Sequence, residues 1–123
     1  MKLIIAGSRN LQLNYQDING LIGIFRLNPS EIVCGGCQGI DEAGKEWGVI
    51  FNYPVITFNA DWKKFGIAAG PIRNKEMALY ADELLLIWDG KSKGSFNMLN
   101  QMKKINKPIY EVILKSPNTK NIT

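Results

Sequence analysis

The chain has 123 residues, of which 46% are hydrophobic and 21% charged. This length suits one globular domain with its own core and is too short for two ordinary ones, and the composition is far from that of disordered chains. The chain contains no histidine, which excludes imidazole bases, His-based zinc sites and the usual serine and cysteine triads. Lysine and arginine outnumber aspartate and glutamate by 15 to 11, and the net charge of +4 weakly favours anionic partners.

Two further counts limit the function. Two cysteines alone cannot supply the four ligands of a zinc site, so we expect no metal and no cofactor. The first apolar run, Leu3–Ala6, is far shorter than the core of a signal peptide or a membrane span. We therefore expect a cytoplasmic protein that does not interact with membranes.

Short apolar runs alternate with segments of helical period along the chain. The runs are bounded by Gly, Pro, Asn or Asp and predict strands buried on both faces, at Lys2–Ala6, Glu31–Cys34, Pro54–Phe58, Glu83–Trp88 and Pro108–Ile113. Four helices are predicted between them, the third with Pro71 in its first turn and the fourth beginning near Ser92. Their apolar stripes are, in order, Tyr15, Ile18, Leu21, Ile22 and Phe25; Ile40, Ala43, Trp47, Ile50 and Phe51; Met77, Ala78 and Ala81; and Met98, Leu99, Met102 and Ile105.

This alternation predicts an α/β fold, a doubly wound three-layer sandwich with a mainly parallel sheet of about five strands. We expect a single domain over residues 1–114, followed by a polar, flexible tail at 115–123 that is rich in Asn and Lys. In such a fold the ligand lies at the carboxyl ends of the strands, near the point where the strand order reverses.

Four segments expected at that edge combine glycine with hydroxyl, amide or charged side chains. They are residues 7–10 (Gly-Ser-Arg-Asn), 35–41 (Gly-Gly-Cys-Gln-Gly-Ile-Asp), 70–74 (Gly-Pro-Ile-Arg-Asn) and 89–95 (Asp-Gly-Lys-Ser-Lys-Gly-Ser). Glycine permits close approach of a ligand to the backbone, and the free N–H groups at a helix N-terminus favour an anion. Each segment alone is equally explained by a tight turn. Four of them at one edge favour a pocket for a phosphate or a nucleotide.

The same segments, with Ala60-Asp61-Trp62 and Met77, resemble the YspA, or cpYpsA-related, branch of the SLOG superfamily. The resemblance runs from about Lys2 to Val112. It implies a Rossmann-like fold, an origin in a bacterial cell or a phage, and binding of a nucleotide or nucleotide-derived ligand. Homodimers are common among SLOG relatives, so a homodimer is also an expectation.

We therefore expect a nucleotide-binding module that senses or sequesters its ligand. Backbone amides, serine hydroxyls and two arginines are expected to contact phosphate or ribose, and the Asp and Asn side chains to contact hydroxyls or a base edge. The predicted ligand-binding residues are Gly7, Ser8, Arg9, Gly35, Gly36, Gly39, Asp41, Arg73, Asn74, Asp89, Gly90, Ser92, Gly94, Ser95 and Asn97. Simpler roles remain open for three of them.

These simpler roles are structural. Arg73 would form a salt bridge with Asp61 or Glu76, Asp41 would complement the dipole of its own helix, and Asp89 would cap the turn that follows it.

Wider SLOG relatives imply two alternative functions. LOG phosphoribohydrolases and nucleoside deoxyribosyltransferases act on the N-glycosidic bond with a glutamate, at a position that aligns with Asn97 here. An amide cannot replace that carboxylate, which leaves Arg73, Asp41 and Asp89 as the candidate catalytic residues. The DNA-processing protein DprA has a segment similar to residues 36–41, which implies single-stranded DNA binding, with Trp62 and Phe65 of the following loop available for base stacking.

Overall fold

The computed structural model describes residues 1–115, which form five strands and five α-helices. The strands are β1 (Lys2–Gly7), β2 (Glu31–Cys34), β3 (Val55–Thr57), β4 (Glu83–Trp88) and β5 (Ile109–Ile113). The helices are α1 (Tyr15–Ile24), α2 (Ile40–Ile50), α3 (Trp62–Phe65), α4 (Ala69–Tyr80) and α5 (Lys93–Lys104), with a 3₁₀ turn, η1, at Gly66–Ala68.

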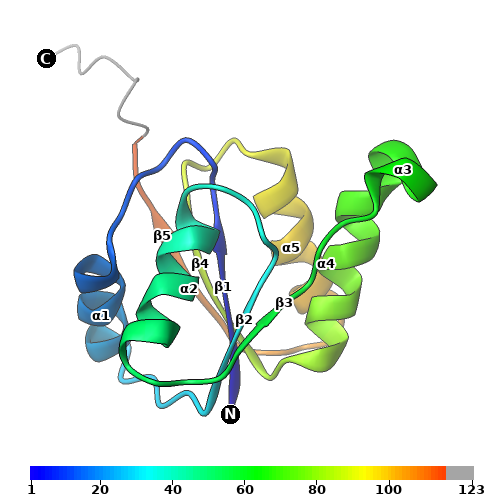
Figure 1. Cartoon of the computed structure of the whole chain (residues 1–123). Helices are drawn as coiled ribbons and strands as arrows, with labels where there is room; N and C mark the ends of the chain where they lie inside the picture. The colour runs from blue at the N-terminus through cyan, green and yellow to red at the C-terminus, as the bar shows by residue number, and fades with distance from the viewer. Residues whose placement is uncertain (116–123) are drawn as a thin grey trace, which may run out of the picture.

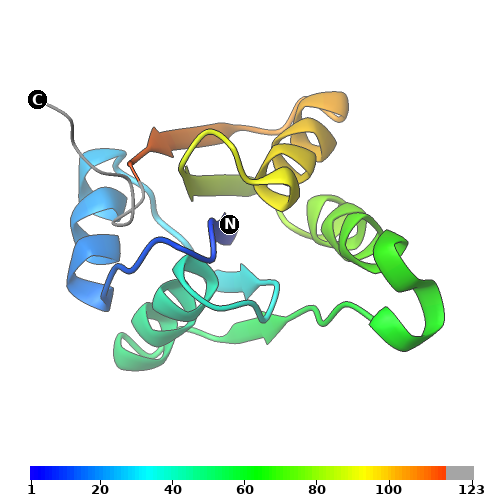
Figure 2. The same ribbon diagram turned by 90° about the horizontal axis from the view of Figure 1, so that it is seen from above.

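The strands form one parallel sheet in the order β3-β2-β1-β4-β5. Helices α1 and α2 cover one face of this sheet, and α4 and α5 cover the other (Figures 1 and 2). The predicted doubly wound, three-layer α/β fold is therefore confirmed. The strand order reverses between β1 and β4, so the crevice that such folds use for ligands lies between the carboxyl ends of these two strands.

The central strands are buried on both faces, as their unbroken apolar runs predict. In β1, Leu3 and Ile5 pack in the core beneath α1 and α2, whereas Ile4 and Ala6 pack in the core beneath α4 and α5. Gly7 ends β1 where the chain passes so close to β4 that a Cβ atom would lie 1.8 Å from the carbonyl oxygen of Ile87. The two strands that border the crevice are thus held in close contact.

The expectation that all five strands are buried on both faces is wrong for β3 and β5. Ile56 in β3 is 37% exposed and Ile113 in β5 is 63% exposed. Both strands lie at the edges of the sheet, where the covering helices leave side chains partly open to solvent. A short apolar run in the sequence does not distinguish an edge strand from a central one.

Three residues predicted in helical core stripes are instead exposed. Phe51 and Ile105 are the C-cap residues that follow α2 and α5, and Ile50 is the last residue of α2. All three are more than one-third exposed because the helices end there, although Phe51 still packs against the ring of Trp47.

The segment before α4 also differs from the prediction. Where a loop was expected, residues 62–68 form the short helix α3 and the turn η1, which extend away from the sheet (Figure 2). Asp61 caps α3 by accepting a hydrogen bond from the Lys64 N–H. Helix α4 begins at Ala69, two residues before Pro71, which nevertheless lies in the first turn, where N–H groups have no partner within the helix.

Three other helix ends are stabilised by side chains that the sequence supplies locally or from a distant segment. Asn14 and Asp17 form a capping box at the start of α1. Ser92 caps α5 by accepting from the Ser95 N–H. At the C-terminus of α4, the Lys107 ammonium group donates to three carbonyl oxygens, those of Ala78, Leu79 and Ala81.

No helix within residues 1–115 has the length and apolar character needed to cross a lipid bilayer. The predicted tail lies outside the described residues, except for Lys115.

Replacement of two helical glycines by alanine is expected to change the stability in opposite directions. Gly44 in α2 faces β1 so closely that a Cβ atom would lie 2.6 Å from Ile5 Cγ2, whereas Gly20 in α1 has nothing within 4 Å. Gly44→Ala should therefore lower the free energy of unfolding by about 1–3 kcal/mol through overpacking. Gly20→Ala should raise it by about 1 kcal/mol, because alanine is the better helix former. Urea unfolding of both variants measures this, and equal effects would contradict the packing described.

Candidate functional site

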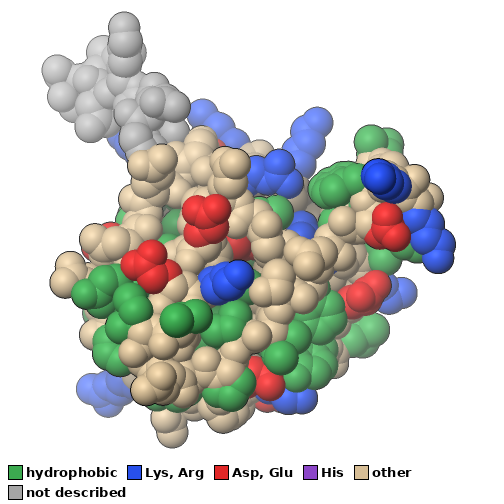
Figure 3. All heavy atoms as spheres, in the orientation of Figure 1, with side chains coloured by type: hydrophobic (Ala, Val, Ile, Leu, Met, Phe, Trp, Pro, Cys, Tyr) green, Lys and Arg blue, Asp and Glu red, His purple; other side chains and the backbone are tan. Residues whose placement is uncertain are grey.

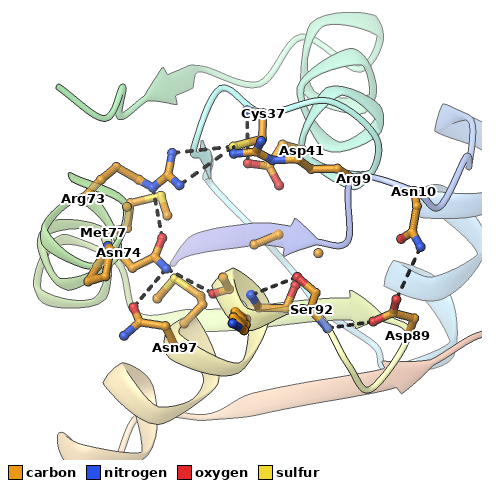
Figure 4. Close-up of a pocket in the computed structure, with 18 of the residues that line it drawn as sticks. Arg9, Asn10, Cys37, Asp41, Arg73, Asn74, Met77, Asp89, Ser92 and Asn97 are labelled. Atoms are coloured by element: carbon orange, nitrogen blue, oxygen red, sulfur yellow. Dashed lines mark hydrogen bonds between the residues drawn. The ribbon is translucent and has the colours of Figure 1, made fainter. Parts of the chain in front are cut away.

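A cavity of about 550 Å³, the main cavity, lies at the carboxyl ends of β1 and β4 (Figure 4). The loops that follow β1, β2 and β4 line it, together with α3, η1 and the beginnings of α4 and α5. Its volume lies within the range usual for small-molecule sites. The predicted site residues that line it are Gly7, Arg9, Asp41, Arg73, Asn74, Asp89, Ser92, Gly94, Ser95 and Asn97.

Five predicted site residues do not line the main cavity: Ser8, Gly35, Gly36, Gly39 and Gly90. Ser8 is fully buried beneath the cavity, where its hydroxyl accepts from the Asp89 N–H. Gly36 and Gly90 have positive φ angles, so they serve the turn geometry that any glycine-rich loop requires. Gly39 lines a second cavity of about 430 Å³, which also includes Arg9, Glu42 and Glu46.

The amides of the glycine-rich loop after β2 bind a carboxylate of the chain itself, that of Asp41. Asp41 Oδ2 accepts hydrogen bonds from the N–H groups of Gly35 (3.1 Å) and Cys37 (3.4 Å). The sequence predicts that the Gly35 amide contacts a ligand phosphate, but this amide already donates to the carboxylate. The Gly35 and Cys37 amides of this loop are therefore paired within the chain.

Arg73 reaches the same loop from α4, on the opposite face of the sheet (Figure 4). Its Nη1 donates to the carbonyl oxygen of Gly35, and its Nε donates to Asn74 Oδ1 at 2.9 Å. Both Nη atoms also lie 3.8 Å from the Cys37 sulfur. The predicted salt bridge with Asp61 or Glu76 is not among these contacts. A Cβ at Gly35 would lie within 3 Å of both Arg73 Nη1 and Asp41 Oδ2, which explains the glycine there.

Burial gives Asp41 an unusual acidity. Its side chain is almost inaccessible to solvent, and this desolvation raises the pKa of Asp41 from its ordinary value of 3.8 to about 6. The hydrogen bond from Cys37, the positive charge of Arg73 and the amides of Gly35 and Gly7 lower the pKa and offset only part of this effect. A carboxyl group that titrates near neutral pH thus lines the main cavity.

Asp89 has the capping role that the sequence left open. Its Oδ1 accepts from the N–H groups of Lys91 (2.8 Å) and Ser92 (2.9 Å), and its Oδ2 accepts from Asn10 Nδ2 (3.4 Å). The pKa of Asp89 lies below its ordinary value, chiefly because of the hydrogen bond from Lys91. Asp89 therefore stays charged and shapes the loop that leads into α5.

The first turn of α5 borders the main cavity and contains an unusual hydroxyl group. Ser95 is 5% exposed, and its Oγ is the one buried side-chain polar atom within residues 1–115 that has no hydrogen-bond partner. Lys93 and Gly94 line the same wall. Lys and Arg side chains also gather above the strand ends, at the upper edge of the molecule in Figure 3.

Two amide side chains join α4 to α5 across the cavity. Asn74 Nδ2 donates to the carbonyl oxygen of Gly94 at 3.2 Å and to Asn97 Oδ1 at 3.1 Å. Because Asn74 Oδ1 accepts from Arg73, a continuous chain of hydrogen bonds runs from the loop after β2 to α5. Asn97 thus lies at the cavity with its oxygen already engaged.

The loop before α5 contains Gly90-Lys91-Ser92, the last three residues of a P-loop motif. A P-loop has a further glycine five residues before this one, and that position is Leu85, a fully buried residue of β4. The segment is therefore a capped turn at the start of a helix and does not have the phosphate-enclosing P-loop pattern.

Several lining residues were not predicted as site residues. The two methionines follow polar site residues on the same helix faces, Met77 four positions after Arg73 and Met98 three positions after Ser95, and the period of these helices could have indicated them. Trp62, which the sequence offers for base stacking only under the single-stranded DNA alternative, and Ile67 come from α3 and η1, which the sequence did not predict. The unpredicted lining residues are Ala6, Asn10, Cys37, Trp62, Ile67, Gly70, Pro71, Met77, Lys93 and Met98.

The described residues contain no cluster of three or more Cys, Asp or Glu side chains that could hold a metal ion. Comparison of the chain with protein-family models, with curated proteins and with solved structures finds no match in any of the three. The resemblance to the SLOG superfamily therefore stays a prediction from the motifs.

The acidity of Asp41 predicts a pH dependence of stability. In the unfolded chain this carboxyl group loses its proton near pH 4, but in the folded protein it does so near pH 6. The contribution of this group to the free energy of unfolding is therefore fully present below pH 4 and is lost as the pH rises through 6. The total loss is about 3 kcal/mol, because a difference of one pKa unit corresponds to about 1.4 kcal/mol.

Urea unfolding of the wild type and of Asp41→Asn at pH 4, 5, 6 and 7 measures this effect. The stability of the wild type relative to the variant should fall across the series. Glu42→Gln removes one negative charge from an exposed neighbour on the same helix and is the control. A difference between wild type and Asp41→Asn that does not change with pH would contradict the raised pKa.

Proposed function

We propose that the protein binds a nucleotide or a nucleotide-derived ligand in the main cavity, as a module that senses or sequesters it. The phosphate of the ligand lies at the N-terminus of α5, and the remainder extends along the cavity. One observation carries this proposal: the buried hydroxyl of Ser95 borders the cavity in the first turn of a 12-residue helix and has no partner.

The physical chemistry of that helix end favours a phosphate. The first N–H groups of a helix have no partners within it, and the helix dipole places partial positive charge there. Ser92 accepts from the Ser95 N–H, which leaves the Lys93 and Gly94 amides for an anion. An unpaired buried hydroxyl costs free energy that a phosphate oxygen would recover by accepting its proton. Lys93, which lines the same wall, adds a positive charge to this helix end.

The other glycine-rich turn does not compete for this phosphate. Its Gly35 and Cys37 amides donate to Asp41, and a guanidinium nitrogen of Arg73 is bound to its backbone. Among the loops that line the main cavity, the start of α5 is therefore the one that combines a helix N-terminus with an unpaired hydroxyl.

The first test separates ligand binding from folding. Ser95→Ala removes a hydroxyl that has no partner, so the free energy of unfolding should stay unchanged or rise by up to about 1 kcal/mol. The same change should weaken binding of the best nucleotide by about tenfold, through loss of a charge-assisted hydrogen bond. Thermal shifts and calorimetric titrations with nucleoside monophosphates and diphosphates, ADP-ribose, NAD and cyclic nucleotides measure both effects.

Ser30→Ala is the matched control, because Ser30 lies beside Met1 at the amino end of the sheet and its hydroxyl is paired. This variant should lose a little stability and bind as the wild type does. Nucleosides without phosphate should bind far more weakly than nucleotides. Unchanged nucleotide affinity in Ser95→Ala would contradict the assignment of the phosphate to α5.

A second candidate function is hydrolysis of the N-glycosidic bond of a nucleotide. The raised pKa of Asp41 favours it, because a carboxyl group that titrates near neutral pH in a cavity suits general acid or base catalysis. Two features favour binding instead. The carboxylate of Asp41 is engaged by the loop, and residue 97 is an amide that faces Asn74.

Chromatography of nucleoside monophosphates incubated with the protein distinguishes the two functions. We expect binding without release of free base. If the wild type releases free base and neither Asp41→Asn nor Arg73→Lys does so, the protein is a hydrolase and the proposal of a binding module is wrong. Circular dichroism must show that both variants are folded.

A further inference from the structure

Trp62 differs from the other two tryptophans of the chain. Trp47 and Trp88 are 3% and 5% exposed, and their indole N–H groups donate to Asn19 and Glu111. Trp62 is 51% exposed, and its indole N–H has no hydrogen-bond partner within the part of the chain that the structure describes. A large aromatic ring is thus left half open to solvent at the edge of the main cavity.

The ring of Trp62 lies close to the first turn of α4. It is the first residue of α3, whose N-terminus is capped by Asp61. The far edge of its indole, Cη2, would lie 3.4 Å from a Cβ at position 70, which is an ordinary van der Waals distance, so the ring lies beside the first turn of α4. The ring therefore rests on α4 and also lines the cavity.

Apolar side chains also line the main cavity. Ile67, Pro71, Met77 and Met98 line the cavity together with the indole. The hydroxyl, ammonium and amide groups that we assign to the phosphate come from the start of α5. The cavity thus offers an aromatic surface to one part of a ligand and hydrogen-bond donors to another.

We infer that Trp62 is the stacking surface for the base of the bound nucleotide and is a specificity-determining residue of this site. This inference rests on the proposed function, because it requires that the phosphate lies at α5. Stacking places the flat face of the base against the indole and removes both apolar surfaces from water. It also assigns the ligand class: the ligand bears a planar aromatic ring in addition to its phosphate, which a sugar phosphate lacks.

A purely structural role for Trp62 makes a different prediction. If the ring only covers the first turn of α4, its removal lowers stability and leaves selectivity between ligands unchanged. The two roles are separated by comparing a ligand that has a base with one that has the same sugar and phosphate but no base.

The test uses calorimetric titration of the full chain with ribose 5-phosphate and with the four nucleoside 5′-monophosphates that carry the common RNA bases. The wild type should bind its best nucleotide at least tenfold more tightly than ribose 5-phosphate, as expected for one stacked base. Trp62→Ala should lose about tenfold for the nucleotide and leave ribose 5-phosphate unchanged. Trp62→Phe keeps a smaller ring and should retain part of the preference. Phe65→Ala, which removes an exposed ring of the same helix that does not line the cavity, is the control.

Each outcome decides the inference. Equal binding of ribose 5-phosphate and the nucleotides by the wild type overturns the stacking role and leaves the phosphate site standing, provided that Ser95→Ala weakens both ligands. A Trp62→Ala variant that loses stability but keeps the preference for nucleotides assigns the ring a structural role and also overturns the inference. If neither these ligands nor the diphosphates, ADP-ribose, NAD and cyclic nucleotides of the first test bind, the proposed function fails and this inference fails with it.

Discussion

The buried carboxylate of Asp41 joins the two sides of the molecule at the carboxyl end of the sheet. It belongs to α2 on one face and accepts hydrogen bonds from the loop after β2. Arg73 belongs to α4 on the other face and donates to the carbonyl oxygen of the same loop. One short loop is therefore held between an anion from one layer of helices and a cation from the other. This arrangement holds Arg73 and its hydrogen-bond partner Asn74, which both line the main cavity.

The two helix N-termini that border the cavity consequently differ in character. In α2, the carboxylate of Asp41 accepts hydrogen bonds from two amides of the preceding loop. In α5, Ser92 satisfies one amide, while the neighbouring hydroxyl of Ser95 is buried without a partner. The same sequence feature, glycine beside polar residues at the start of a helix, thus gives a turn whose amides are paired in one case and a turn with a buried, unpaired hydroxyl in the other. The difference lies in which polar groups have already found partners within the fold.

The fold followed from the sequence because its strongest signals are local. Apolar runs of strand length alternate with helical periods, and only a parallel sheet covered on both faces buries both. The errors occurred where burial depends on distant neighbours. The sequence does not show that β3 and β5 lie at the edges, that Phe51 and Ile105 follow the ends of their helices, or that residues 62–68 form helical turns. The loops of the site could be predicted because they directly follow strands. The hydrogen bonds of Gly35 with Asp41 and Arg73 could not, because they are tertiary contacts.

The missing side chain at Gly35 has a consequence for how this protein can change in evolution. A Cβ at this position would approach both the carboxylate of Asp41 and the guanidinium of Arg73 to within 3 Å. Loss of Arg73 alone would leave a buried carboxylate without its nearby positive charge, and loss of Asp41 alone would leave two loop amides unpaired. The three positions are therefore coupled, so that a homologue with a larger residue in place of Gly35 is also expected to differ at Asp41 or Arg73.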